Sequence, residues 1–130
     1  MFGKKSADSD QPKGIGKIQK TEEQYITFYK AKLYKEALIE CNLAIQLDRN
    51  NAQAHYVKSM ILADLERYEE ALVAFEQAIQ LNPRAAYMYA SKGMALYKLG
   101  RFEEVILACG EAIRLIWGGK RHARRDRAYA

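Results

Sequence analysis

Residues 67–81 read RYEEALVAFEQAIQL, and this stretch decides the fold. A similar stretch, LYKEALIECNLAIQL, occupies residues 33–47, and another, RFEEVILACGEAIRL, occupies residues 101–115. The three copies start at positions 33, 67 and 101, a constant spacing of 34 with no insertion. A fixed period of this length is typical of a protein built from helical repeats. Within the middle copy, apolar residues recur at the spacing of one helix face: Tyr68, Ala71, Leu72, Phe75, Ala78, Ile79 and Leu81.

A second helical stretch precedes this one within the same copy. Over residues 52–65 the apolar positions again have helical spacing, and only Glu66 and Arg67 separate them from the next helix. In the third copy, Gly100 follows Leu99 at the point where a residue of positive φ would close a helix. Two helices joined by so short a turn must lie antiparallel. Each copy is therefore predicted to be one helical hairpin.

Small residues recur where two helices of such a hairpin would approach closely. A side chain larger than alanine would push the helices apart at these points, so small positions set the crossing angle. They are Ala37, Ala44, Ala71, Ala78 and Ala112, with Ser59 and Gly93 at matching sites on the preceding helices. Pro83 ends the second hairpin and restricts Asn82 to extended backbone, which gives the next copy a fixed direction.

This pattern resembles the tetratricopeptide repeat family. In the copy that starts at Ala52, the family's typical residues are Ser59, Ala71, Phe75, Ala78 and Pro83. In the third copy, residues 95–104, ALYKLGRFEE, are similar to the family consensus nearly residue for residue. The first copy departs from it, with Tyr25 where glycine is usual, Lys32 at the turn and Arg49 in place of proline. The family's usual tryptophan is replaced by Thr21, His55 and Tyr89.

The resemblance implies an all-α fold, a right-handed alpha-alpha superhelix or α-solenoid of three hairpins. It covers residues 18–117, in units of about 18–51, 52–85 and 86–117. Residues 1–17 are then a flexible basic tail, and residues 118–130 a basic tail or a partial capping helix. In this family the first helix of each pair lines a concave groove that binds a peptide or helix of another protein. The chain is expected to be such an interaction module, an adaptor or scaffold.

The family's groove positions, carried over one by one, give a surface rich in tyrosine and methionine. Such side chains offer large, adaptable and partly polar contact area. The alternative is that several of these aromatic residues simply complete the core between helices. The predicted groove residues are Gln19, Glu22, Ile26, Tyr29, Lys30, Gln53, Tyr56, Met60, Asp64, Tyr87, Met94, Tyr97 and Lys98, together with Ala63 and Ala90.

Some members of the family hold the carboxylate tail of heat-shock chaperones with a basic and asparagine clamp on the same groove. The matching positions here supply no cation and no amide, so the sequence predicts that this chain does not bind such a carboxylate tail. These positions are Glu22, Ile26, Val57, Tyr87 and Ser91.

The positive charge of this sequence lies in its ends. The formal net charge is +5, but residues 1–20 carry +3 and residues 118–130 carry +4, which leaves −2 for residues 21–117. A charge-based argument for nucleic-acid binding therefore fails for the repeat body. Association of the basic termini with nucleic acid or an anionic membrane stays open as the second hypothesis. The alternative is that each terminus is a short run of solvated charges without a binding role.

The sequence contains little that could support chemistry. His55 and His122 are the only histidines and Cys41 and Cys109 the only cysteines, in no pattern of metal ligands or nucleophile and base. We therefore predict no enzyme activity, no metal, no cofactor and no small-molecule substrate. The first twenty residues lack the apolar run of a secretory signal, and no stretch reaches the length of a membrane span, so a cytoplasmic location is predicted.

The end of the last repeat needs a cover. Gly118 and Gly119 are predicted to stop its second helix. Solenoids usually add a polar capping helix at this point. Here the apolar Ile113, Ile116 and Trp117 could instead be covered by the C-terminal tail, by a partner, or by a second copy of the chain in a weak self-association.

Overall fold

The computed structural model describes the backbone of residues 24–129 and the side chains of residues 24–118. The predictions for residues 1–17, Gln19 and Glu22 lie outside that range. The described residues form helices and no strands, which confirms the all-α class. After a helical segment at residues 24–30 come α3 (Tyr34–Leu47), α4 (Ala52–Asp64), α5 (Tyr68–Leu81), α6 (Ala86–Lys98) and α7 (Phe102–Tyr129).

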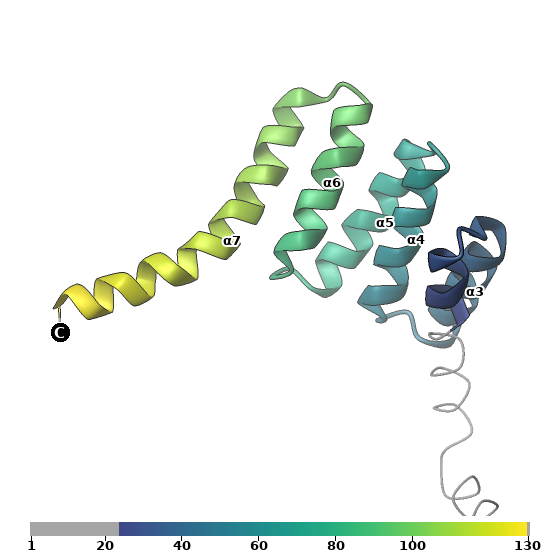
Figure 1. Ribbon diagram of the computed structural model, residues 1–130, viewed down its shortest axis with the longest axis horizontal. Helices are drawn as coiled ribbons and strands as arrows, with labels where there is room; N and C mark the ends of the chain where they lie inside the picture. The colour runs from purple at the N-terminus through teal and green to yellow at the C-terminus, as the bar shows by residue number, and fades with distance from the viewer. Residues whose placement is uncertain (1–23, 130) are drawn as a thin grey trace, which may run out of the picture.

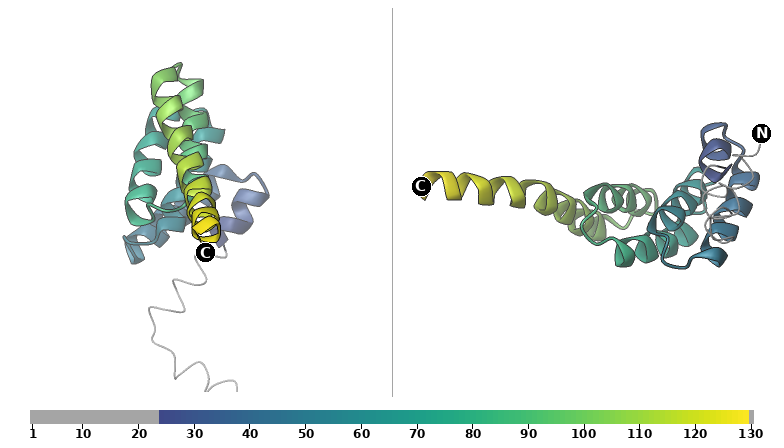
Figure 2. Two further views of the ribbon diagram at one scale, coloured as in Figure 1. Left: turned by 90° about the vertical axis from the view of Figure 1, so that its left-hand side faces the viewer. Right: turned by 90° about the horizontal axis from the view of Figure 1, so that it is seen from below.

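The helices follow one another as a row of antiparallel hairpins (Figure 1). Within the hairpins α4 packs along α5 and α6 along α7, while α3 against α4 and α5 against α6 join one hairpin to the next. Among the described helices, contacts therefore link only neighbouring units, as in a solenoid. The predicted helical-repeat fold is confirmed. Seen from below, the row is elongated and α7 continues well beyond the rest (Figure 2).

The three hairpin turns use the same backbone conformation at the same place in the repeat. Lys32, Glu66 and Gly100 have φ angles of 61°, 62° and 73°. The following residue donates its backbone N–H back across the turn, as Arg101 does to the carbonyl of Leu96 at 3.0 Å. Glycine adopts this left-handed conformation at least cost, and the third repeat alone has glycine there. The prediction for Gly100 is confirmed.

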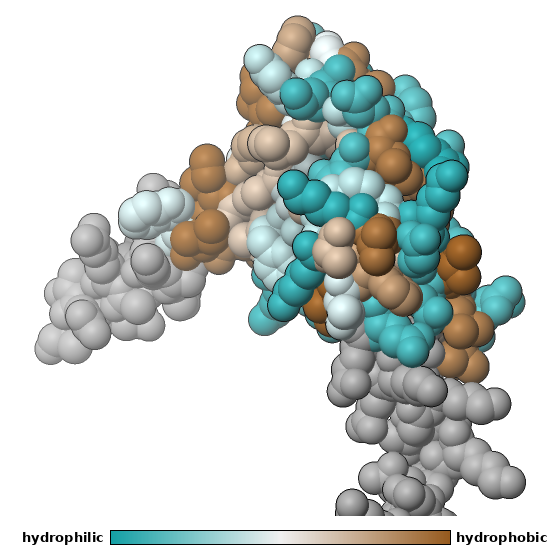
Figure 3. All heavy atoms as spheres, turned by 45° about the vertical axis from the view of Figure 1, so that its right-hand side comes forward, coloured by the Kyte–Doolittle hydropathy of each residue, from teal (hydrophilic) through white to brown (hydrophobic). Residues whose placement is uncertain are grey.

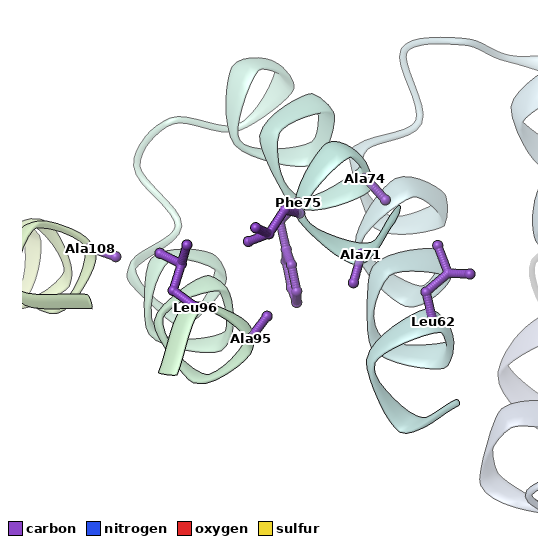
Figure 4. Close-up of a cluster of buried hydrophobic side chains, with 8 residues drawn as sticks. Leu62, Ala71, Ala74, Phe75, Ala95, Leu96 and Ala108 are labelled. Carbon is purple, nitrogen blue, oxygen red and sulfur yellow. The ribbon is translucent and has the colours of Figure 1, made fainter. Parts of the chain in front are cut away.

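The core consists of clusters at successive helix crossings. All the alanines predicted to mark those crossings are buried, as are Ser59 and Gly93. Phe75 of α5 is fully buried between helices, with Ala71 and Leu62 on one side and Ala95 and Leu96 of α6 on the other (Figure 4). One large ring among small residues lets the helices stay close while filling the space between them.

The predicted end of the last helix is wrong. Helix α7 runs through Gly118 and Gly119 without a break and ends at Tyr129. Each glycine costs a helix interior only about 1 kcal/mol relative to alanine and keeps its backbone N–H donor, so two of them weaken a helix without ending it. The residues that follow, KRHARRDRA, are mostly good helix formers. Residues 118–129 are thus an extension of α7 and form no separate capping helix.

A candidate binding face on the first helices

The first helix of each hairpin lies beside the first helix of the next. Between α4 and α6, the Tyr56 hydroxyl and the Ser91 hydroxyl are 2.9 Å apart, within hydrogen-bonding distance. The Tyr56 ring also meets the ring of Tyr87 edge-on, with centroids 5.0 Å apart. We call the surface formed by residues 24–30, α4 and α6 the first-helix face. It is the surface on which the predicted binding residues were placed.

A cavity of about 290 Å³ opens on this face between α4 and α6. Its size is at the lower limit of cavities that hold small organic ligands, and it suits one or two protein side chains. Five of the predicted binding residues line it, namely Met60, Ala63, Asp64, Met94 and Lys98. The remaining lining residues are Tyr68, Ser91 and Ala95.

The sequence did not predict Tyr68, Ser91 and Ala95 as parts of a binding surface. Tyr68 begins α5, and its helical spacing assigned it to the packing stripe of that helix. Ser91 lies one turn after Tyr87 and was considered only as a position of the carboxylate clamp. The periodicity that identifies a helix face carries no information on which second-helix residue reaches across to it.

Asp64 forms the acidic side of the cavity, next to two tyrosines of the first repeat. Burial raises the pKa of Tyr29 to about 12, and the charge of Asp64 and its hydrogen bond with the tyrosine add to the rise. Burial and the same carboxylate also raise the pKa of Tyr34. Both hydroxyls therefore stay protonated and can donate to the carboxylate of Asp64. The two rings pack with centroids 6.2 Å apart.

The other predicted residues divide between the surface and the core. Tyr87 and Tyr97 are exposed, and Tyr97 meets Phe102 of α7 with ring centroids 5.7 Å apart. Tyr56 is half-buried and packs against Phe75, so it contributes to the core as well as to the face. Ile26 packs against the core cluster that surrounds the buried Tyr25, while Gln53, Ala90 and Lys30 are exposed.

The carboxylate-clamp positions form no clamp in the described residues. Val57 is buried in the core, and Ser91 is within hydrogen-bonding distance of Tyr56. Tyr87 packs against the same tyrosine, and Ile26 lies partly buried in the first repeat. None of these side chains can neutralise a terminal carboxylate.

His55 has a structural environment. It is buried at the start of α4, and its Nε2 lies 3.1 Å from the carbonyl oxygen of Arg49, to which Nε2–H can donate. Among the residues described, no group of three or more His, Cys, Asp or Glu side chains could hold a metal ion. In the same part of the chain no helix combines the length and apolar character needed to cross a membrane.

Comparison with known families gives a match in the centre of this arrangement. A family model described as TPR repeat matches residues 61–100, from the last turn of α4 to the turn after α6. Residues 61–100 thus match a tetratricopeptide repeat, and the described helices have the fold of that family. No curated protein matches the full sequence. Tetratricopeptide repeats are in general modules that bind proteins and do not themselves catalyse reactions, although some enzymes carry them as additional domains.

Solved structures share this tetratricopeptide fold at low sequence identity. MamA AMB-1 superposes with a TM-score of 0.73 and 20% identity, covering 78% of this chain and 55% of MamA. The first TPR of Spaghetti (RPAP3), bound to the HSP90 peptide SRMEEVD, superposes with a TM-score of 0.74 and 20% identity. The match covers 77% of this chain and 79% of that structure. A mutant O-GlcNAc transferase of Thermobaculum terrenum superposes with a TM-score of 0.75 and 17% identity. The match covers 81% of this chain and 20% of the transferase. This chain thus spans just over half the length of the MamA structure, and the likeness is one of fold.

Proposed function

We propose that this chain binds a segment of another protein on its first-helix face. The cavity between Met60 and Met94 carries the proposal, because it is an open apolar recess on the surface that this fold uses for ligands. Methionine side chains are flexible and polarizable, so they adapt to an inserted apolar group. An exposed thioether such as Met94, 67% accessible, gains most from being covered.

The charged groups at the cavity suggest which segment would fit. Asp64 is exposed and can accept hydrogen bonds from the hydroxyls of Tyr29 and Tyr34. An arginine or lysine of the bound segment could pair with it while an adjacent apolar side chain enters the recess. Lys98 lines the same cavity and would favour an acidic residue elsewhere in the segment. We infer a ligand with an apolar anchor beside a basic residue.

The experiment is selection of binders from a random-peptide display library on the full chain. The selected peptides should share an apolar residue next to lysine or arginine. Met94→Glu should weaken their binding at least about tenfold, equivalent to about 1.4 kcal/mol. Ile39→Glu is the matched control, because Ile39 is 66% exposed on α3, a second helix of its hairpin, and should leave binding unchanged.

Either of two outcomes would remove the proposal. One is the absence of any shared pattern among the selected peptides. The other is equal binding to wild type and Met94→Glu when circular dichroism shows both folded. The second hypothesis, binding of nucleic acid or membrane by the basic termini, concerns side chains beyond those described and stays a prediction. The cytoplasmic location also stays a prediction.

A further inference from the structure

The outer side of α7 carries apolar residues that no described part of the chain covers. Ile106 is 71% exposed and Ile113 56% exposed. One period of 34 residues earlier, their counterparts Leu72 and Ile79 are each only 8% exposed, since they cluster with residues of α6. The stripe on α7 is therefore of the kind that this fold covers with another helix. On the face drawn in Figure 3, apolar residues gather beside the grey C-terminal segment.

The same side of α7 has a hollow of about 290 Å³, lined by Gly110, Ile113, Arg114, Trp117 and Gly118. The first four of these have the spacing i, i+3, i+4 and i+7, which is the arrangement that receives one side chain of a facing helix in knobs-into-holes packing. At Gly110 an added Cβ would meet no atom within 4 Å, so the glycine leaves the floor of the hollow open. The helix thus presents both protruding side chains and a place to receive one.

The stripe is symmetric about its own middle. Ile106 and Ile113 lie equally far from the midpoint between Cys109 and Gly110, and so do Phe102 and Trp117. We propose that two copies of this chain pair through α7, antiparallel, about a two-fold axis at that midpoint. Each Ile106 then lies opposite Ile113 of the second copy and enters its hollow, while Phe102 meets Trp117 of the second copy. A surface that matches itself in this way is what an isologous dimer requires.

Charge favours the antiparallel direction. Glu103 and Arg114 are separated by about three helical turns and so lie on the same flank of the stripe. Antiparallel pairing brings Glu103 near Arg114 of the second copy on each side of the axis, whereas parallel pairing would place the two charged flanks on opposite sides of the seam and leave Glu103 without this partner. Arg114 already forms an ion pair with Glu111 of its own helix, so its guanidinium is held at the surface. The small Gly110, beside the axis, lets the two helices approach closely.

The oligomeric state tests the pairing. Sedimentation velocity of the full chain should show a concentration-dependent dimer, since one helix pair buries an interface at the weak end of the range. Ile106→Glu and Ile113→Glu should each make the chain monomeric while helicity by circular dichroism is unchanged. Leu107→Glu is the control, because Leu107 is 73% exposed on the same helix about 100° away from Ile106 and should leave the dimer intact.

A second measurement tests the direction. In a Cys109→Ala background, an equal mixture of Ile106→Cys and Ile113→Cys chains should form a mixed disulfide when oxidised with copper phenanthroline. Neither variant alone should do so, because two copies of the same residue would lie about 10 Å apart along the axis. A wild type that stays monomeric up to about 300 μM, equal disruption by Leu107→Glu, or crosslinking of Ile106→Cys alone would overturn the proposal. No residue of α7 lines the cavity between Met60 and Met94, so peptide binding there can fail or succeed independently of this result.

Discussion

At the scale of single residues, the hairpin turns show where this sequence departs from the best choice. Lys32 and Glu66 hold positive φ angles that glycine adopts with little cost, whereas Gly100 holds the same angle in the third repeat. A side chain at such a position costs roughly 1–2 kcal/mol in backbone conformation. The chain tolerates this cost twice, because the N–H groups of Leu33 and Arg67 close these turns just as that of Arg101 closes the third.

Glu66→Gly should therefore stabilise the protein by about 1 kcal/mol, as read from urea denaturation. Gly100→Ala should destabilise it by a similar amount, and the cause must lie in the backbone, because an added Cβ at Gly100 meets no atom within 4 Å. Glu66→Ala separates the two effects, since it removes the charge and keeps the strain. If Glu66→Ala stabilised as much as Glu66→Gly, the backbone explanation would be wrong.

Cys41 provides a second residue-scale prediction. Burial raises the pKa of its thiol to about 12 from an ordinary value of 9.0, so the folded state favours the protonated form. This contribution to stability is complete below pH 9 and is lost as the pH rises towards 12. At pH 8, N-ethylmaleimide should label the half-buried Cys109 first and reach Cys41 only through unfolding, as mass spectrometry of tryptic peptides can show. Equal labelling rates would contradict the burial of Cys41.

At the scale of elements, Gly93 of α6 marks a close approach between α6 and α7. A Cβ built there would lie 3.1 Å from Sγ of Cys109 and 3.8 Å from Cβ of Ala108, both on α7. Two opposing effects follow for Gly93→Ala: a gain in helix propensity of about 1 kcal/mol and a cost from displaced sulfur. The net change of the single variant is therefore a poor test, whereas the coupling between the two sites is a sharp one.

A double-mutant cycle measures this coupling. Gly93→Ala should be more favourable in a Cys109→Ala background than in the wild type, by about 0.5–1.5 kcal/mol, because the sulfur that the new methyl group meets is gone. Urea denaturation of the wild type, the two single variants and the double variant gives this coupling free energy. The matching cycle with Gly110→Ala, whose added Cβ meets no atom within 4 Å, should show a coupling near zero. A coupling of zero in the first cycle would mean that α6 and α7 simply move apart.

The helix boundaries and the cavity lining differ in how well the sequence predicts them. The prediction of residues 52–65 for α4 and the turn at Gly100 agree with the structure, because a repeated pattern supplies the same signal several times. The predicted stop at Gly118 and Gly119 failed, because a helix that already has its hydrogen-bond ladder tolerates two glycines at modest cost. Tyr68 was missed as a lining residue, since spacing along one helix does not reveal what side chains from two helices enclose together.

At the scale of the whole molecule, stability depends on the middle of the row. The second hairpin, α4 and α5, contacts helices on both sides, whereas α7 packs only on α6 within the described residues. In such a one-dimensional array the end units open at lower free energy than the central ones. Hydrogen exchange should therefore be slowest in α4, α5 and α6, and faster in α3 and along α7 beyond the end of α6.

Phe75 is the residue on which this distribution depends most. It is fully buried and belongs to a cluster that includes Leu62 of α4 and Leu96 of α6, so it couples the second hairpin to the third. Phe75→Ala should cost about 3–5 kcal/mol, which is a large share of the stability of a domain this size. Beyond that loss, the variant should let α6 and α7 exchange separately from residues 24–64, and the denaturation curve should broaden. Cys41→Ala, which empties a smaller site within the first repeat, is the control and should leave the exchange of α6 unchanged. Uniform acceleration across every helix in Phe75→Ala would instead mean that the repeats open as a single unit.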